Sequence, residues 1–261
     1  MEELCDRLDT LQTRLASSDA DVLAAQRLRY QVFVTELGAS GKMVDHDAGR
    51  EADRFDDFAD HLLLEDLSRP EDNRVVGTYR LMHEQAAVAA GQFYCADEYN
   101  LEPLTGSGLR LLELGRSCLL PAYRGGAGMH LMWQTLSRYI AQHQIDLLFG
   151  VASFHGTDPQ ALAQPLSLLH QKHLAPPHLR VRAKGPQAVP LNILPPDAID
   201  RVQAVRQMPA LIKAYLRLGG RVGADAFVDL EFNTTDICLL LEKSAISALQ
   251  KSIYSKGVAG V

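Results

Sequence analysis

The residues best suited to chemistry are two charged side chains inside the apolar stretch 111–119, where Glu113 and Arg116 are three positions apart. An unpaired charge in such a strand would cost on the order of several kcal/mol, so both residues need partners or a function. A regular strand would point them to opposite faces, whereas a bulge at Gly115 would bring both to one face and free backbone N–H groups. Free N–H groups suit the oxyanion of acyl transfer, and a carboxylate suits proton removal from an amine. The alternative is an ion pair at a sheet surface.

Two further candidates for catalysis follow the apolar run 145–151. Ser153 and His155 come where loops of α/β sheets often form active sites, although N-capping and turn formation would also explain this string. His170 and His173 offer two imidazoles at i and i+3. Because no carboxylate or cysteine nearby completes a ligand set, we expect no metal site.

Arginines and aspartates in the N-terminal half could bind a charged substrate. A guanidinium group matches a carboxylate, and an aspartate matches an ammonium group. Arg29 and Phe33 share one helix face at i, i+4, while the aspartates belong to the acidic stretch 42–60, for which a solvated loop is the usual alternative. The candidate substrate-binding residues are Arg29, Phe33, Asp53, Asp56 and Arg80.

A glycine-rich turn, 123–128, lies between a predicted strand and a predicted helix. Its backbone N–H groups could hold a phosphate at the helix N-terminus, or its glycines could serve only a tight turn. A second basic cluster lies in the proline-rich segment 176–196. The residues concerned are Arg124, Gly125 and Gly126 in the turn, and Arg180, Arg182 and Lys184 in the cluster.

The order of the elements predicts an α/β protein with a mixed sheet. A helix capped by Asp21 and ended by Gly38 precedes a polar, acidic stretch over 42–60, which we predict to be a long functional loop or a lid. The strands expected next are 62–64 and 74–82, paired as an antiparallel hairpin, then 111–119, 145–151 and 236–241. The helices expected are 129–142, one starting at Asp158-Pro159, 196–207 and 209–218. We expect a frayed tail from Lys251.

The composition limits the classes of protein to consider. With 261 residues, 47% of them hydrophobic, the chain can bury a full core. A net charge of -6 disfavours nucleic acid as a partner. No apolar run reaches the roughly 18 residues that span a bilayer, and the acidic N-terminus is unlike a signal peptide, so we expect a cytoplasmic location. The four cysteines include no C-x-x-C pair, which indicates reduced thiols.

Several short motifs occur in the order seen in acyl-homoserine-lactone synthases. They are Arg29-x-x-x-Phe33, Asp53-x-Phe55-Asp56, Gly77-Thr78-Tyr79-Arg80 and Glu113-x-x-Arg116. The chain resembles more fully the ornithine–acyl-carrier-protein N-acyltransferases that make lyso-ornithine lipid, over residues 25–243. The matching strings include 55–62 (FDDFADHL), 113–118 (ELGRSC), 123–127 (YRGGA), 152–159 (ASFHGTDP), 211–220 (LIKAYLRLGG) and 232–236 (FNTTD).

This resemblance implies a GNAT fold, with a mixed central sheet that has a splayed strand pair, in a single domain over 20–243. Segments 1–19 and 244–261 would be peripheral. It implies transfer of a fatty or 3-hydroxy fatty acyl group from acyl carrier protein to the α-amine of ornithine, with no permanently bound cofactor. The donor thioester would be carried on phosphopantetheine. The basic residues of the turn and cluster, from Arg124 to Lys184, would then meet the acidic carrier.

The sequence departs from the related families at two places, and two alternative functions are considered. Ala127 and Met129 depart from the usual GNAT phosphate loop, which argues against tight coenzyme A binding, and no tryptophan follows Phe33 as in the lactone synthases. The alternatives are an N-acetyltransferase that uses acetyl-coenzyme A, and a non-catalytic module that binds acyl carriers or a membrane surface. Peripheral contact with the inner membrane surface is also compatible with the sequence.

Overall fold

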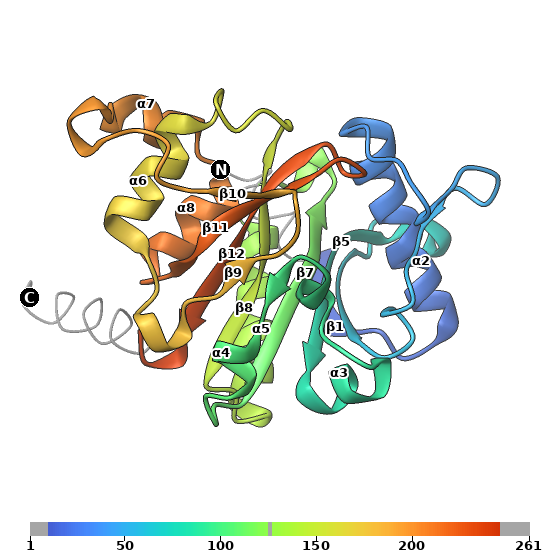
Figure 1. Ribbon diagram of the computed structural model, residues 1–261. Coiled ribbons are helices and arrows are strands. Elements are labelled where there is room, and N and C mark those ends of the chain that lie inside the picture. Colours follow the sequence, from blue (N-terminus) through green and yellow to red (C-terminus); the bar gives the residue numbers. More distant parts are fainter. Residues whose placement is uncertain (1–9, 125–126, 246–261) are drawn as a thin grey trace, which may run out of the picture. The chain divides into compact units, whose positions relative to one another are not determined.

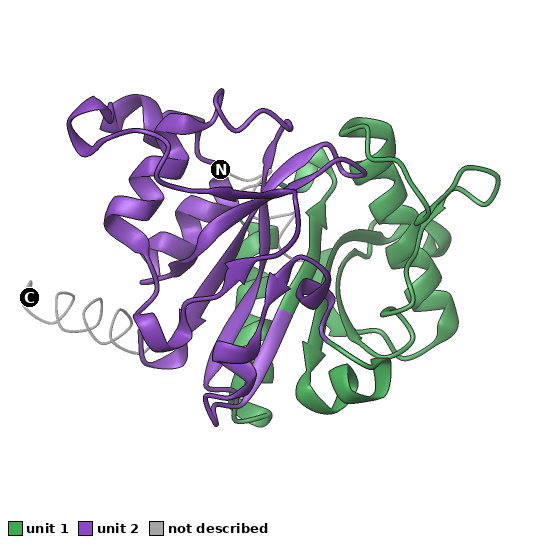
Figure 2. Cartoon of the chain, viewed as in Figure 1, with its two compact units in different colours: residues 1–92, 114–144 green, residues 93–113, 145–261 purple. Residues whose placement is uncertain are grey.

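The computed structural model describes residues 10–124 and 127–245 (Figure 1). Gly125, Gly126 and the tail from Lys251 therefore lie outside the described residues. Contacts divide the chain into two compact units, coloured separately in Figure 2. Unit 1 comprises residues 1–92 and 114–144, and unit 2 comprises residues 93–113 and 145–261. The domain boundaries inferred from the sequence stay a prediction.

Unit 1 is built around a buried antiparallel strand, β4. It pairs with β1 on one edge and with β5 on the other. Leu62, Leu63 and Leu64 are all fully buried, which requires cover on both faces of β4, and α2 and α5 both contact this strand. The elements are β1 (Leu11–Leu15), α2 (Asp19–Arg29), a π-helix (Tyr30–Glu36), β2 (Val44–Asp45), β3 (Arg50–Glu51), β4 (Asp60–Asp66), a 3₁₀ turn (Glu71–Asn73), β5 (Val75–His83), α3 (Glu84–Ala90), a 3₁₀ turn (Pro121–Tyr123) and α5 (Ala127–Gln142).

Unit 2 is built on β8 and β12, which pair antiparallel from Leu147–Glu242 to His155–Thr234. Strands β11 and β10 follow β12 at one edge. The main elements are β8 (Leu147–His155), α6 (Ala163–His173), β10 (Ala188–Pro190), α7 (Arg201–Gln207), α8 (Ala210–Arg217), β11 (Arg221–Asp229) and β12 (Thr234–Glu242). Short elements are the 3₁₀ turns Tyr94–Asp97, Pro177–Leu179 and Pro196–Ala198, with β6 (Tyr99–Asn100), α4 (Glu102–Thr105) and β9 (Arg182–Ala183).

Strand β7 (Leu111–Leu119) contributes residues to both units. The hydrogen-bonded strand order is β1-β4-β5-β7-β8-β12-β11-β10, a mixed sheet of eight strands with helices around it, as the sequence predicted. The parallel ladder of β7 and β8 runs from Leu111–Leu147 to Glu113–Phe149 and stops there, although both strands continue. The splayed strand pair inferred from the sequence stays a prediction. Among the described residues, no helix combines the length and the apolar character that a bilayer crossing needs.

The structure corrects three predicted helix starts. The helix predicted over 196–207 begins only at Arg201, because Asp200 is its N-cap and accepts the Val202 and Gln203 N–H groups. The first helix begins at Asp19 rather than after Asp21, because Ser18 is the N-cap and its hydroxyl accepts the Asp21 N–H at 3.2 Å. The helix predicted to start at Asp158-Pro159 begins only at Ala163, because the Asp158 carboxylate accepts the Gln160 N–H in a turn.

The structure also corrects the interpretation of two segments. The stretch 42–60 contains the short hairpin β2–β3, and its acidic residues Glu51 and Asp56 are buried, so the alternative of a solvated loop is wrong. Ser153 and His155 lie within β8 rather than after it. Beyond the apolar run 145–151, buried and exposed residues alternate along the strand, which is the pattern of a strand with one covered face.

Candidate active site

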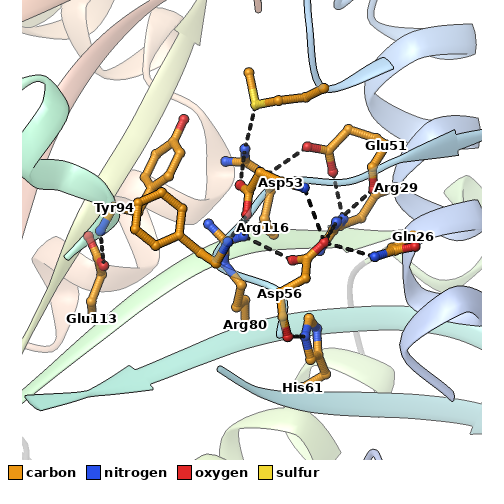
Figure 3. A network of polar contacts seen from close by, with 12 residues as sticks. Gln26, Arg29, Glu51, Asp53, Asp56, His61, Arg80, Tyr94, Glu113 and Arg116 are labelled. Carbon is orange, nitrogen blue, oxygen red and sulfur yellow. Dashed lines mark hydrogen bonds and ion pairs between the residues drawn. The ribbon is translucent and has the colours of Figure 1, made fainter. Parts of the chain in front are cut away.

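A buried network of charged side chains lies in unit 1 (Figure 3). It joins α2, the segment from β3 to the start of β4, and strands β5 and β7. Each side chain in it is at most 8% exposed. Because three arginines face three carboxylates, the desolvation of each charge is offset by an opposite charge in contact. The members are Arg29, Arg80, Arg116, Glu51, Asp53 and Asp56.

Arg29 forms the inner part of the network, with a fully buried side chain. Its terminal nitrogens donate to the two carboxylate oxygens of Asp56 at 2.8 and 2.5 Å, a bidentate pair. Its Nε lies 2.6 Å from Glu51 Oε2. Burial raises the pKa of Asp56, but the hydrogen bonds and charge of Arg29, with the charge of Arg80, lower it more, so the net pKa lies well below its usual value. Asp56 is therefore ionised.

Arg80 and Arg116 form the outer part of the network around Asp53. Arg80 donates to Asp53 Oδ1 at 2.6 Å and to Asp56 Oδ1 at 3.0 Å. Arg116 donates to Asp53 Oδ2 at 2.9 Å and through Nε to Glu51 Oε1 at 3.1 Å. Burial raises the pKa of Asp53, but the two arginines lower it more, so its net pKa is also below the usual value.

The backbone irregularity predicted at Gly115 falls at Arg116. Arg116 has φ of 53°, in the left-handed region that side chains other than glycine rarely adopt, whereas Gly115 has no positive φ. The left-handed residue changes the direction of β7 in the middle of the strand. The ion pairs with Glu51 and Asp53 hold Arg116 in this conformation.

Two residues of the site escaped the sequence analysis. Glu51 is fully buried and bridges Arg29 and Arg116, and only its place in the acidic stretch beside Asp53 could have indicated it. His61 lies 3.1 Å through Nε2 from the carbonyl oxygen of Asp56. Burial holds the pKa of His61 below its usual value, which favours a neutral ring that donates from Nε2 to this carbonyl.

Glu113 is 3% exposed, and its carboxylate is held by backbone N–H groups of unit 2 (Figure 3). Tyr94 N–H donates to Oε2 at 2.7 Å and Cys95 N–H donates to Oε1 at 2.6 Å. The carboxylate thereby satisfies N–H groups at the start of the 3₁₀ turn Tyr94–Asp97.

Ser153 and His155 lie on the open face of β8. Both are exposed, and Phe154 between them is buried, which is the alternation of a half-covered strand. They are two positions apart and therefore share one face. Phe33, the remaining substrate-binding candidate, is half-buried in the π-helix Tyr30–Glu36.

The donor-side candidates already have partners within their own units. Arg124 donates to both oxygens of Glu36 at 2.6 Å and through Nε to the Leu119 carbonyl at 3.0 Å. Arg180 donates to the carbonyl oxygen of Ala175 at 2.8 Å, and Lys184 donates to the carbonyl oxygen of Ala96. Arg182 is the most exposed, at 71%, with a long contact of 3.4 Å to Asp225.

The described residues close enough to share a cation are Glu98, Asp229 and Asp236, whose ligand oxygens lie within 4.8 Å of one another. His170 and His173 do not belong to this group. A cluster of carboxylates offers the oxygen ligands that Ca²⁺ or Mg²⁺ prefers, but acidic groups commonly gather without an ion.

Comparison with known proteins shows which family the chain belongs to. Residues 28–134 match the acetyltransferase (GNAT) domain, a span that includes the whole buried network. The L-ornithine N(alpha)-acyltransferase of Rhodobacter capsulatus is 51% identical over 251 residues, which cover 95% of this chain and 96% of that protein. That of Brucella abortus is 44% identical over 252 residues, which cover 95% and 90%.

Solved structures resemble the chain more distantly. The coenzyme A-dependent acyl-homoserine lactone synthase BjaI is 15% identical with a TM-score of 0.49, covering 93% of this chain and 89% of its own. The N-acyl amino acid synthase FeeM, from uncultured soil microbes, is 12% identical with a TM-score of 0.49, covering 89% and 90%.

The mixed sheet with its interrupted parallel ladder and the GNAT domain match define an acyltransferase of the GNAT class. The relatives that match along nearly the whole length narrow the class further. The chain belongs to the L-ornithine N(alpha)-acyltransferase family.

Proposed function

We propose that this protein transfers a fatty acyl group from acyl carrier protein to the α-amine of L-ornithine, which gives lyso-ornithine lipid, the first intermediate of ornithine lipid synthesis. The observation that carries the proposal is the 51% identity, over 95% of this chain, to a relative named for that acceptor and that nitrogen. The donor is a thioester on the phosphopantetheine arm of the carrier, which is a substrate rather than a resident cofactor.

The reaction needs a neutral amine next to a thioester carbonyl. Glu113, directly or through one water, accepts a proton from the α-ammonium group of ornithine. The amine lone pair then forms the new C–N bond, backbone N–H groups of the irregular strand β7 stabilise the oxyanion, and the C–S bond breaks. The nitrogen loses its second proton as the amide forms, and the leaving phosphopantetheine thiolate takes up that proton to become a thiol.

The acceptor meets the outer part of the charged network. The side chains of Arg80, Arg116 and Asp53 are 3 to 8% exposed. The carboxylate of ornithine can therefore replace Asp53 as a partner of the arginines, and its ammonium group can pair with Asp53. Arg29 and Asp56 are 0 to 1% exposed and hold each other through two hydrogen bonds, so their role is to position the outer residues. Phe33 contributes apolar contact beside them.

Donor competition tests the overall activity. The purified protein is given ornithine together with long-chain acyl carrier protein and acetyl-coenzyme A in equal amounts. We expect the long-chain amide to dominate by at least about tenfold. Acetylornithine as the main product would replace the proposal with an acetyl-coenzyme A-dependent N-acetyltransferase, and binding of acyl carrier protein without any product would indicate a non-catalytic module.

Paired variants test the base. Glu113→Gln keeps the side-chain shape and an oxygen for one backbone N–H, while it removes the basic carboxylate. We expect kcat to fall about 10²–10⁴-fold, the usual range for loss of general base catalysis. His155→Ala, on the open face of β8, is the matched comparison. Full turnover of Glu113→Gln together with loss of turnover in His155→Ala would make His155 the base.

The basic residues Arg124, Arg180, Arg182 and Lys184 are proposed to meet the acidic carrier protein. Charge reversal of the exposed Arg182 should raise the KM for acyl carrier protein, more strongly at low salt, with little change in kcat. An unchanged KM at low salt would remove Arg182 from this role.

A further inference from the structure

A segment whose charged residues are all basic follows the proline-rich part of unit 2. Between residues 201 and 224 the sequence has five basic residues and no acidic residue, although the whole chain carries a net charge of -6. The segment contains α7 and α8, and Figure 1 shows α7 at the edge of unit 2 beside α6. The basic residues are Arg201, Arg206, Lys213, Arg217 and Arg221.

Helix α7 presents apolar and basic side chains on one face. Val202 is 72% exposed and Val205 is 47% exposed, whereas Ala204 is fully buried. At about 100° per residue, the two valines lie between Arg201 and Arg206 on an arc of about 140°, and Ala204 lies on the opposite side. The face turned away from unit 2 therefore has an apolar centre with a guanidinium group on each side.

This face is already ordered. Asp200 caps the helix by accepting the Val202 and Gln203 N–H groups at 2.9 and 3.1 Å. Gln164 of α6 accepts the Asp200 N–H at 2.7 Å, which fixes the start of α7. Neither Arg201 nor Arg206 forms an ion pair with a residue that the structure describes. Binding to a flat surface would thus require no folding of the helix.

We propose that the exposed face of α7 is the surface on which the protein contacts an anionic lipid bilayer. Valines between arginines are the arrangement of an interfacial helix, with apolar side chains at the level of the acyl chains and guanidinium groups at lipid phosphates. The exposed Asp197 and the N-cap Asp200 lie at the start of the helix and reduce the net charge of the segment 197–224 from +5 to +3, which stays positive.

The inference rests on the proposed function, because the product would be a single-chain lipid. A long acyl chain strongly favours a bilayer over water, so an enzyme that releases such a product gains from contact with the membrane that takes it up. An acidic carrier protein would also be attracted by the arginines, but it would not require two exposed valines between them.

Vesicle flotation tests the proposal with the full-length protein. The wild type should bind vesicles of phosphatidylglycerol and phosphatidylcholine, and bind pure phosphatidylcholine about tenfold more weakly or worse. Arg201→Glu/Arg206→Glu should lose about tenfold or more of the binding to anionic vesicles, and Val202→Ser/Val205→Ser should lose a smaller part. The matched controls are Arg27→Glu/Arg138→Glu, exposed arginines of helices in unit 1, and Val88→Ser, 80% exposed on α3.

The same variants are assayed for turnover with soluble acyl carrier protein and no vesicles. Unchanged kcat/KM together with lost vesicle binding supports the proposal. A raised KM for acyl carrier protein with vesicle binding intact would overturn it and make α7 a carrier docking surface, and so would a wild type that does not bind anionic vesicles. If ornithine is not acylated but binding still depends on α7, the proposed function fails while the surface stands.

Discussion

Arg29 depends on its neighbours because its guanidinium group has no contact with solvent. Asp56 occupies its two terminal nitrogens and Glu51 lies beside its Nε. A substrate carboxylate could reach Arg29 only by displacing a buried partner, which would leave that partner's charge uncompensated. The arginines of the sequence motifs therefore share carboxylate partners, and those partners determine which arginine a substrate can reach.

Glu51 is the residue on which this sharing can be tested. Glu51→Gln removes one negative charge between Arg29 and Arg116, which leaves two buried guanidinium groups with fewer partners. Removing one partner of a buried pair typically costs about 3–5 kcal/mol, so the urea midpoint should fall markedly.

The control is Asp45→Asn, which breaks the exposed contact of 3.4 Å to Arg50 in the nearby hairpin β2–β3. We expect no measurable change in its unfolding midpoint. Equal midpoints for Glu51→Gln and the wild type would mean that Glu51 does not hold the network together.

At the scale of elements, close packing fixes the turn that ends α8. A Cβ atom at Gly220 would lie 2.7 Å from the Tyr215 carbonyl oxygen, which is backbone of the last helical turns and cannot move aside easily. A Cβ atom at Gly115 in β7 would meet nothing within 4 Å.

We therefore expect Gly220→Ala to destabilise the protein by about 1–3 kcal/mol, the usual range for forced overpacking, and Gly115→Ala to leave the unfolding midpoint nearly unchanged. Thermal unfolding of the two variants side by side measures this. A larger loss in Gly115→Ala than in Gly220→Ala would mean that β7 needs the glycine for its bend and that Arg116 is not the irregular residue.

Elements with strong periodicity were predictable from the sequence, and local capping and long-range pairing were not. The spacing around Glu113 predicted β7 with its observed ends, and the runs 62–64 and 74–82 predicted the hairpin β4–β5. Strand β11 was missed, because Gly223 and alternating small residues give it little apolar pattern. The start of α2 was missed because Ser18, not Asp21, supplies the cap.

The candidate site was predictable in its residue types more than in its contacts. The sequence indicated five of the charged residues that pair in the network, including Arg29 and Arg80, by their place in apolar segments and by family motifs. It did not indicate Glu51, and it treated the aspartates as ligands for a substrate rather than as partners of the arginines. Pairing between residues far apart in sequence depends on the fold, which spacing alone does not give.

At the scale of the whole molecule, the buried groups predict how stability depends on pH. The pKa of His61 is lowered by burial, so the unfolded chain binds a proton first as the pH falls below about 6.5, and stability begins to decline there. Asp53 and Asp56 also have lowered pKa values, so their contribution is present above about pH 4 and is lost as the pH falls further.

Urea midpoints between pH 7.5 and 3 measure both declines. His61→Asn should lessen the first decline, between about pH 6.5 and 5, and leave the second in place. Part of the first decline should remain, because burial also lowers the pKa of His173. A midpoint in the wild type that stays constant from pH 7.5 to 5 would contradict a neutral, buried His61.

If the chain joins a carrier-borne acyl group to the α-nitrogen of ornithine, that nitrogen must end in an amide bond. The purified protein is incubated with long-chain acyl carrier protein and ornithine labelled with ¹⁵N at the α-position, and the product is fragmented by mass spectrometry. We expect the label in the amide bond. Acylation of the side-chain amine, with the label left in a free amine, would contradict it, as would the absence of any acylated ornithine.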